Sequence, residues 1–308
     1  MTYALLMALL PIALLIALGA WLKHRAFVAA SFWPQAERLG YYVLLPSLFL
    51  HGLATAKLDG VPLQGMISAL VLSTVAVALL VVVARTWVKG DGAAFTSVFQ
   101  GGVRFNNYVG VSAAAGLFGA QGIALAAVAN AAIVPTVNIL CVLVFAWYGA
   151  AGRMPLGKVL RQLALNPLVL ACFAGIALQA LGTGLPPGIE PVLKALGQAS
   201  LPLGLLCVGA ALELGSVRQW LRPVGYASVV KFLIMPLVTL CACHLFGLGG
   251  EAAIAALLFQ ALPTASSSYI MARQLGGDAP LMAGIIACQT VLAAVALPVA
   301  VIALTPLI

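Results

Sequence analysis

The chain has 308 residues, of which 64% are apolar and 7% are charged. A soluble domain carries about 25% charged residues, so this composition excludes an ordinary soluble protein and favours one embedded in a lipid bilayer. The net charge of +8 is not gathered in a basic and aromatic cluster. It therefore excludes a nucleic-acid-binding role and favours contact with anionic lipids.

Apolar stretches of about 20 residues predict ten membrane-spanning helices. They cover residues 3–22, 36–55, 63–84, 95–116, 122–148, 163–181, 195–212, 224–246, 252–274 and 280–306. The first stretch is too long for a signal peptide and has no basic segment before it, so we expect it to stay in the mature protein. The connections are short, and the basic loop from Gly149 to Gln162 marks the midpoint.

The fourth span holds the densest group of polar residues. It contains Gln100, Gly101, Gly102, Arg104, Asn106, Asn107, Tyr108, Gly110 and Ser112. Polar side chains are costly in a membrane and mark functional positions. Glycines on both sides of the Arg-Asn-Asn run weaken the helix, and the amides can bind freed backbone groups or a ligand. We therefore predict a break in this span.

The ninth span has a matching polar group. It contains Gln260, Pro263, Thr264, Ser266, Ser267, Ser268 and Tyr269. Pro263 removes a backbone donor and clashes with the preceding turn, while the hydroxyls can bind the exposed carbonyls. A second break is predicted here. The alternative is that these residues join helices and that Pro263 only kinks one.

Landmarks recur along the chain at nearly constant separation. Pro11 and Pro167, Gly19 and Gly175, and Pro46 and Pro202 are each 156 positions apart; Asn107-Tyr108 and Ser268-Tyr269 are 161 apart, and Pro135 and Pro298 are 163 apart. Chance is the alternative explanation, because apolar helices draw on few residue types. We predict an all-α integral membrane fold of two five-helix repeats, residues 1–150 and 151–308. Since five is odd, the second repeat is inverted, and broken helices 4 and 9 cross near the midplane.

The basic residues predict the orientation. One side carries Lys23, Arg25, Arg38, Arg85, Lys89, Arg153, Lys158, Arg161, Arg218, Arg222 and Arg273, and the other carries Lys57 and Lys194. The positive-inside rule makes the first side cytoplasmic, so both termini are expected outside the cytoplasm. Chain length and richness in Ala and Leu agree with a bacterial inner membrane.

No metal site, cofactor or enzyme activity is predicted. The six cysteines lie in apolar spans without a Cys-x-x-Cys pair. His24, His51 and His244 stand apart, and no carboxylate next to them in the sequence would orient a ring. We also find no nucleophile or acid–base pair at catalytic spacing.

Two basic residues lie inside spans. Arg104 and Lys231 have no acidic partner in the sequence nearby, and all seven acidic residues lie in loops or near span ends. An unpaired interior cation suits an anionic ligand, which we expect for Arg104 beside the Asn pair. For Lys231 we expect the side chain to reach the lipid headgroups. Without midspan carboxylates, a carboxylate-based proton or sodium relay is not predicted; coupling through a protonated substrate, or no coupling, stays open.

The same residues carry a family resemblance. The motifs are Arg104-Phe105-Asn106-Asn107-Tyr108, Leu117-Phe118-Gly119 with Gly122, Pro135-x-x-Asn138, Asn166-Pro167-Leu168 and Leu201-Pro202-Leu203-Gly204-Leu205. In this order they resemble bacterial transporters of the auxin efflux carrier family over nearly the whole chain. Ala261-Leu262-Pro263 with Tyr269 and Ala272 is similar to the ninth helix of the plant PIN-formed auxin carriers.

The resemblance implies a homodimeric carrier of small organic anions with elevator-like movement. Helices 1, 2, 6 and 7 would form a scaffold, and helices 3–5 and 8–10 a transport subdomain, in a fold similar to those of sodium/proton antiporters and bile acid symporters. Gly110-Val111-Ser112 and Ser268 stand where plant carriers have crossover prolines. Malonate-like carboxylates are therefore implied first, and auxin-like acids second.

The predicted site residues fall into three groups. Substrate binding is assigned to Arg104, Asn106, Asn107, Tyr108, Ser112, Gln260, Ser266, Ser267, Ser268 and Tyr269; the crossover to Gly101, Gly102, Gly110 and Pro263; and support to Asn138 and Gln289. One alternative is a sodium- or proton-coupled carrier resembling the bile acid symporters, which an ion requirement would reveal. Another is a receptor, which would bind a ligand without flux.

Overall fold

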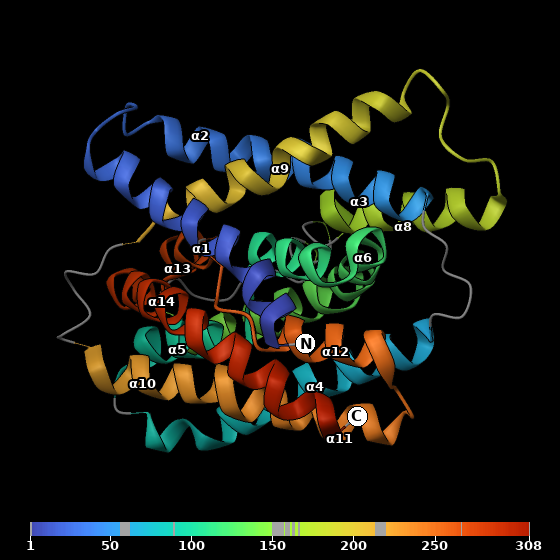
Figure 1. Cartoon of the computed structure of the whole chain (residues 1–308). Helices are drawn as coiled ribbons and strands as arrows, with labels where there is room; N and C mark the ends of the chain where they lie inside the picture. Colours follow the sequence, from blue (N-terminus) through green and yellow to red (C-terminus); the bar gives the residue numbers. More distant parts are fainter. Residues whose placement is uncertain are drawn as a thin grey trace. The chain divides into compact units, whose positions relative to one another are not determined.

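The computed structural model describes residues 2–55, 62–88, 90–149, 157, 161, 164–165, 167–212, 220–265 and 267–307. Of the residues named above, these lie outside the described ranges: Lys57, Lys89, Arg153, Lys158, Gln162, Asn166, Arg218 and Ser266. Two of the seven acidic residues, Asp59 and Glu213, also lie outside them. Every regular element in the described ranges is helical (Figure 1). The prediction of an all-α protein is therefore confirmed for the part of the chain that the structure describes.

From the N-terminal end, the helical elements begin with α1 and run to α8. Their bounds are α1 Thr2–His24, α2 Phe32–Leu39, η1 Gly40–Leu44, α3 Leu45–Ala54, α4 Leu63–Val83, η2 Ala84–Trp87, α5 Gly92–Val103, α6 Asn107–Tyr148 and α8 Pro167–Leu181. Helix α6 is interrupted at Gly119, whose φ of 57° is left-handed and disfavours residues with a Cβ. The end of the fourth predicted span and the fifth span are therefore two helical segments joined at this glycine.

The second half continues from α9 to the C-terminal end. The bounds are α9 Glu190–Ala210, α10 Leu221–Val229, η4 Val230–Ile234, α11 Met235–Leu245, α12 Gly250–Gln260, α13 Ser267–Leu275, α14 Ala279–Leu304 and η5 Thr305–Leu307. Two elements, η1 and η4, are single π-helical turns. Pro46 and Pro236 each follow such a turn, and each proline ring would clash with a carbonyl four residues earlier, within the turn. The wider π turn relieves this clash.

Five helical stretches in the described residues are long and apolar enough to cross a membrane. They are Leu63–Trp87, Gly92–Tyr148, Glu190–Ala210, Leu221–Leu245 and Ala279–Leu304. Shorter apolar helices cover Leu10–His24, Leu170–Leu181 and Gly250–Gln260. A membrane-embedded protein is thus supported, whereas the ten-helix inverted repeat stays a prediction.

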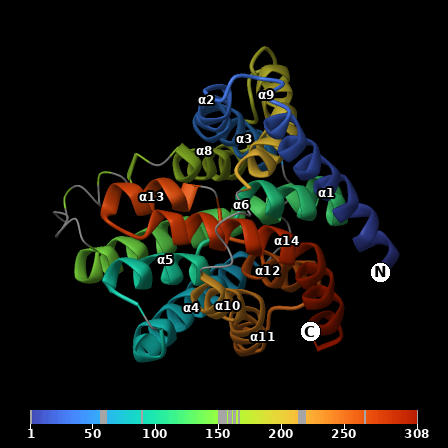
Figure 2. The ribbon, with the colours of Figure 1, turned by 90° about the vertical axis from the view of Figure 1, so that its left-hand side faces the viewer.

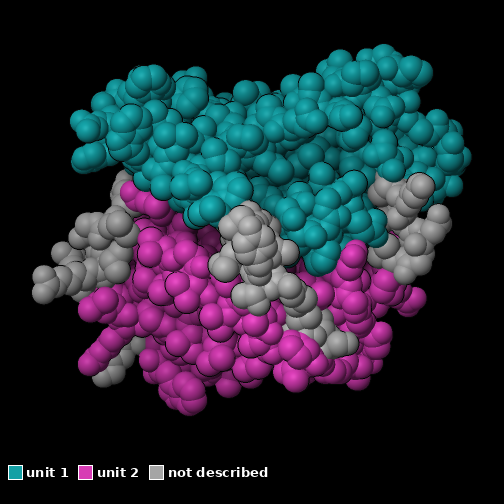
Figure 3. Space-filling view, in the orientation of Figure 1, with its two compact units in different colours: residues 1–61, 107–131, 162–211 teal, residues 62–106, 132–161, 212–308 magenta. Residues whose placement is uncertain are grey.

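The chain divides into two compact units, coloured separately in Figure 3. Unit 1 comprises residues 1–61, 107–131 and 162–211, and unit 2 comprises residues 62–106, 132–161 and 212–308. The fourth predicted span is divided between them, because its first half lies in unit 2 and its second half in unit 1. The boundaries of the two repeats and the assignment of scaffold and transport helices stay predictions.

Unit 1 is built around α9, which packs against α1, α2 and α3, while α3 also packs along α8 (Figure 1). Glycines allow close approach of α1 and α9. Gly19 faces the backbone of Leu206, and Gly209 faces the backbone of Ile16, so a Cβ at either glycine would clash. Small residues at helix contacts are the usual means of packing in membranes, where lipid is as apolar as the side chains.

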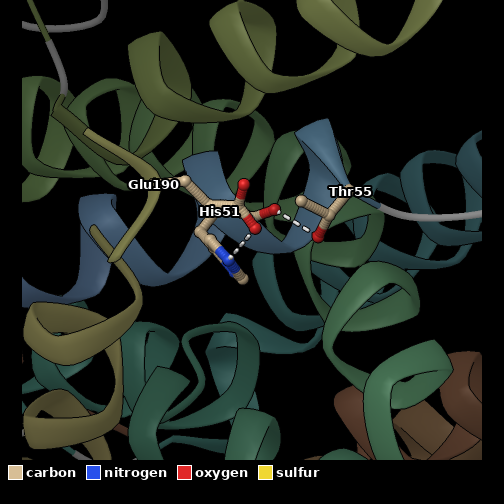
Figure 4. A network of polar contacts seen from close by, with 3 residues as sticks. All are labelled: His51, Thr55 and Glu190. Atoms are coloured by element: carbon tan, nitrogen blue, oxygen red, sulfur yellow. Dashed lines mark hydrogen bonds and ion pairs between the residues drawn. The ribbon is translucent and has the colours of Figure 1, made fainter. Parts of the chain in front are cut away.

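A polar contact lies between two helices of unit 1. Figure 4 shows His51 of α3 facing Glu190 in the first turn of α9, with 3.7 Å between Nε2 and Oε1. The Thr55 hydroxyl donates to the carbonyl of His51 at 2.8 Å. The sequence has no carboxylate next to His51, and packing of the two helices is what brings the distant Glu190 near it.

Unit 2 contains α4, α5, the end of α6 from residue 132, and α10 to α14 (Figure 2). Helix α5 packs against α4, α10, α13 and α14, and α12 packs against α4, α11 and α14. Aspartates begin two of these helices. The Asp91 carboxylate accepts a hydrogen bond from the Ala94 amide at the start of α5, and Asp278 accepts one from Leu281 at the start of α14. These caps satisfy amides that would lack partners in the first helical turn.

Candidate functional site

The fourth predicted span is broken directly after α5. Arg104 has extended backbone with φ −76° and ψ 158°, Phe105 and Asn106 are also non-helical, and helix α6 begins at Asn107. Gly101 and Gly102 precede this break and remain helical. A Cβ on Gly101 would lie 2.7 Å from Cγ2 of Ile285, and one on Gly102 would lie 2.9 Å from Cγ1 of Val230. The two glycines therefore allow neighbouring helices to approach, and the break follows them.

The ninth predicted span is broken between α12 and α13. Helix α12 ends at Gln260, residues 261–265 are not helical, and α13 begins at Ser267. Pro263 lies in the middle of the non-helical segment, where its missing amide hydrogen requires no partner. The predicted break is thus present, and Pro263 is part of it.

The two non-helical segments meet within unit 2. The backbone amide of Asn106 donates to the Pro263 carbonyl at 2.8 Å. Beside this bond, the rings of Phe105 and Phe259 meet edge to face with centroids 5.9 Å apart. A backbone hydrogen bond between two interrupted helices satisfies groups that a membrane interior cannot hydrate.

Gln289 of α14 holds both segments. Its Oε1 accepts from the Thr264 amide at 3.0 Å, and its Nε2 donates to the Gly101 carbonyl at 2.9 Å. The side chain is completely buried. One amide thus satisfies a donor freed in the second break and an acceptor freed at the end of α5. A role of Gln289 in supporting the substrate site stays a prediction.

Arg104 points to the first turn of α13. Its Nη2 donates to Oγ of Ser267 at 3.2 Å, and its Nη1 lies 3.1 Å from Oδ1 of Asn138 and 3.3 Å from Sδ of Met271. All these partners are neutral, and no carboxylate of the described residues pairs with the guanidinium. Because the N-terminal end of a helix is itself positive, this corner of unit 2 carries positive potential without a counter-charge.

The two glutamines of the broken spans have different surroundings. Gln260 donates to the hydroxyls of Ser73 and Thr74 in α4 at 3.0 and 2.8 Å, so it joins α12 to α4. Gln100 donates to the Ser268 carbonyl at 3.4 Å, and the Ser268 hydroxyl lies 3.2 Å from that of Thr264. Both glutamines are completely buried, which favours support of the crossing. Tyr269 of α13 is 36% exposed.

Four predicted site residues belong to unit 1: Asn107, Tyr108, Gly110 and Ser112. The Tyr108 ring lies against the backbone of Gly204, and its hydroxyl lies beside Gly40, so the ring is part of the packing of this unit. Gly110 is helical and buried inside α6. Oδ1 of Asn107 and Oγ of Ser112 are buried and have no hydrogen-bond partner within the described ranges, which leaves both oxygens open to a ligand.

Lys231 does not reach the lipid headgroups, and that expectation was wrong. Its side chain is completely buried in the π turn η4 of unit 2, and Nζ has no hydrogen-bond partner among the described residues. The π turn changes which face of the helix is turned inward, and sequence spacing alone does not reveal it. No pattern in the sequence pointed to Met271, whose sulfur faces Arg104.

The site contains no arrangement that would hold a metal ion within the described residues, because no three side chains of His, Cys, Asp or Glu come together there. What the arrangement offers is a cation, a helix N-terminus and several neutral hydroxyl and amide groups. Such a set recognises an anion with oxygen atoms, such as a carboxylate.

Known proteins resemble this chain along nearly its whole length. A family model described as "Membrane transport protein" matches residues 4–301. A protein of Rhizobium meliloti (strain 1021) named "Putative malonate transporter" is 26% identical over 250 residues, which cover 76% of this chain and 75% of the relative. An "Uncharacterized transporter" of Methanothermobacter thermautotrophicus is 22% identical over 294 residues, which cover 94% and 95% of the two chains.

Proposed function

Because the chain belongs to the membrane transport protein family, a transporter family with auxin efflux carrier-like members, we propose that it is a secondary carrier of small organic anions. The family and the relatives are transporters rather than enzymes. The relative named for malonate supports a small carboxylate as the substrate. The observation that carries the proposal is the Arg104 guanidinium, held by neutral partners at the first turn of α13.

The charge at this position favours an anion over a cation or a neutral solute. The positive end of α13 repels the guanidinium, so this arrangement is electrostatically unfavourable by itself. A carboxylate would relieve the repulsion and could accept two parallel hydrogen bonds from Arg104. Ser267 and Asn138 already contact the guanidinium and would orient it. Asn106 and Ser268, which also belong to unit 2, are the further candidates for hydrogen bonds to the substrate.

The proposed transport mechanism is of the elevator type. Helices 3–5 and 8–10 would carry the substrate past a scaffold of helices 1, 2, 6 and 7, in a homodimer of the inner membrane with both termini outside the cytoplasm. The crossing of the two broken spans supports this proposal, because interrupted helices that meet in a membrane are typical of carrier binding sites. The bond from Asn106 to Pro263 ties the two breaks together, so they would move as one.

Direct binding of malonate to the purified protein tests the role of Arg104. Arg104→Gln should weaken binding about 10- to 100-fold, because a hydrogen-bonded charge contributes about 1.5–3 kcal/mol. Arg273→Gln is the matched control, since Arg273 is an exposed arginine of α13, the helix whose first turn Arg104 contacts. Isothermal titration calorimetry with malonate, other small carboxylates and indole acetate would rank the substrates.

Flux measurements separate the carrier from the other functions. Liposomes containing the protein should take up the anion that binds best, and Arg104→Gln should lose this uptake. Equal affinity of Arg104→Gln and the unaltered protein would remove Arg104 from the site. Tight binding without flux would indicate a receptor, and currents that appear only with a sodium gradient would favour a sodium-coupled carrier.

A further inference from the structure

Lys231 is a buried cation that the proposed anion site does not use. It lies in the π turn η4 between α10 and α11, its exposure is 0%, and Nζ has no hydrogen-bond partner among the described residues. Pro236 follows this turn in α11, and its ring imposes the wider helical geometry. Single π turns inside helices are frequent at functional sites.

The elements packed against η4 supply no negative charge. These elements are α4, α5, α10, α11 and α14. Helices α4 and α5 have no titratable side chain; the others contribute Arg222, Tyr226, Cys241, Cys243, His244 and Cys288. Arg222, Cys241 and His244 are exposed. No carboxylate of these elements therefore balances an ammonium at Lys231.

The described carboxylates of unit 2 cap a helix or are exposed. Asp91 and Asp278 cap α5 and α14, and Glu251 is exposed in the first turn of α12. The buried positive groups are Lys231 and the partly buried Arg104. Both lie next to residues at the end of α5, because Arg104 directly follows this helix and Val230, which precedes Lys231, faces Gly102. The interior of unit 2 thus has a surplus of positive charge.

Lys231 and Arg104 differ in whether they can lose their positive charge. An unpaired charge in an apolar interior is costly, and a protein avoids the cost by neutralising the group or pairing it. An arginine keeps its proton under all ordinary conditions. A lysine can release its proton and become a neutral amine. An anion entering unit 2 would balance the charge and make the ammonium favourable again.

We propose that Lys231 carries a proton that is transported together with the organic anion. On the uptake side, the neutral amine takes a proton from water as the anion binds near Arg104. On the other side, the anion leaves, and the ammonium releases the same proton to water. No covalent bond changes and no other reactant is needed. The inference rests on the proposed function, and it names both the coupling ion and the residue that binds it.

The test measures malonate and proton uptake in the same liposomes. Labelled malonate reports the anion, and a trapped pH dye reports the proton. The unaltered protein should take up one proton for each malonate. Lys231→Met should retain malonate uptake and lose the coupled proton, and Lys231→Arg, which keeps a charge that cannot be released, should also lose it. Lys194→Met is the matched control, because Lys194 is an exposed lysine of α9.

A stability measurement shows that the variants are folded. Replacing a buried amine that has no hydrogen-bond partner among the described residues with an apolar side chain should leave the thermal unfolding of Lys231→Met unchanged or raise its midpoint. Proton uptake that persists in Lys231→Met would overturn the inference and show that the proton travels on the substrate. Proton coupling retained in Lys231→Arg would overturn it as well. No anion flux in the unaltered protein would instead refute the proposed carrier function.

Discussion

At the scale of single residues, we predict that replacing Gln289 lowers the stability of the protein. Its amide satisfies the buried Thr264 amide and the buried Gly101 carbonyl, so Gln289→Leu leaves both without a partner. Each such group costs about 1–3 kcal/mol, and we expect a loss of roughly 3 kcal/mol in the free energy of unfolding. Thermal unfolding of the purified protein in detergent measures this as a midpoint lower by several degrees.

Thr290→Val, at the neighbouring position, is the control for Gln289→Leu. The Thr290 hydroxyl donates only to the Ile286 carbonyl of its own helix, at 2.7 Å, so its loss should cost less than about 1 kcal/mol. Equal midpoints for the two variants would mean that the Gln289 amide does not hold the crossing together.

Residues of the crossing could be identified from the sequence because a polar group in an apolar span needs an explanation. Arg104, Ser267 and Asn138 indeed meet in the structure, and Gln289 joins the two breaks. The inward direction of Lys231 could not be predicted. A π turn adds one residue to a helical turn and rotates the following positions by about 100°.

At the scale of elements, we predict opposite effects on stability for alanine substitutions at Gly119 and Gly225. A Cβ added at either position would have no neighbouring atom within 4 Å, so steric contacts do not distinguish them. Gly119 has a left-handed φ of 57°, whereas Gly225 lies in helix α10 without a positive φ. Gly119→Ala should therefore destabilise the protein by about 1–2 kcal/mol, and Gly225→Ala should stabilise it by about 0.5–1 kcal/mol.

Thermal unfolding of both alanine variants in the same detergent checks the pair. Opposite shifts of the midpoint are expected. A stabilising effect of Gly119→Ala would mean that α6 continues through this position without a left-handed residue.

The predicted breaks were near the correct residues for different reasons. Pro263 interrupts hydrogen bonding by its own chemistry, and the second break contains it. Gly101 and Gly102 only permit an interruption. In α5 both remain helical, because they allow Ile285 and Val230 to approach, and a helix satisfies backbone groups in a membrane. The first break accordingly begins at Arg104, and its position depends on packing that the sequence does not show.

At the scale of the whole molecule, composition was enough to predict a helical membrane protein. With 7% charged residues, the chain cannot form the surface of a soluble protein, so we expect it in a bilayer. Helices suit a bilayer because they pair their backbone groups internally. The repeat is a weaker prediction, since matching prolines and glycines locate equivalent positions without fixing the direction of a span. The division of the fourth span between the two units follows from contacts among distant segments, which spacing in the sequence does not contain.

The orientation is the prediction that tests the whole chain. Eleven basic residues are assigned to the cytoplasmic side and two to the other side. In a Cys241→Ala background, which removes an exposed native cysteine, Lys194→Cys and Arg222→Cys each introduce a thiol at an exposed position. Intact cells treated with a membrane-impermeant maleimide should label Lys194→Cys, and Arg222→Cys should be labelled only after permeabilisation. The reverse pattern would place both termini in the cytoplasm, because inverting the chain exchanges every loop at once.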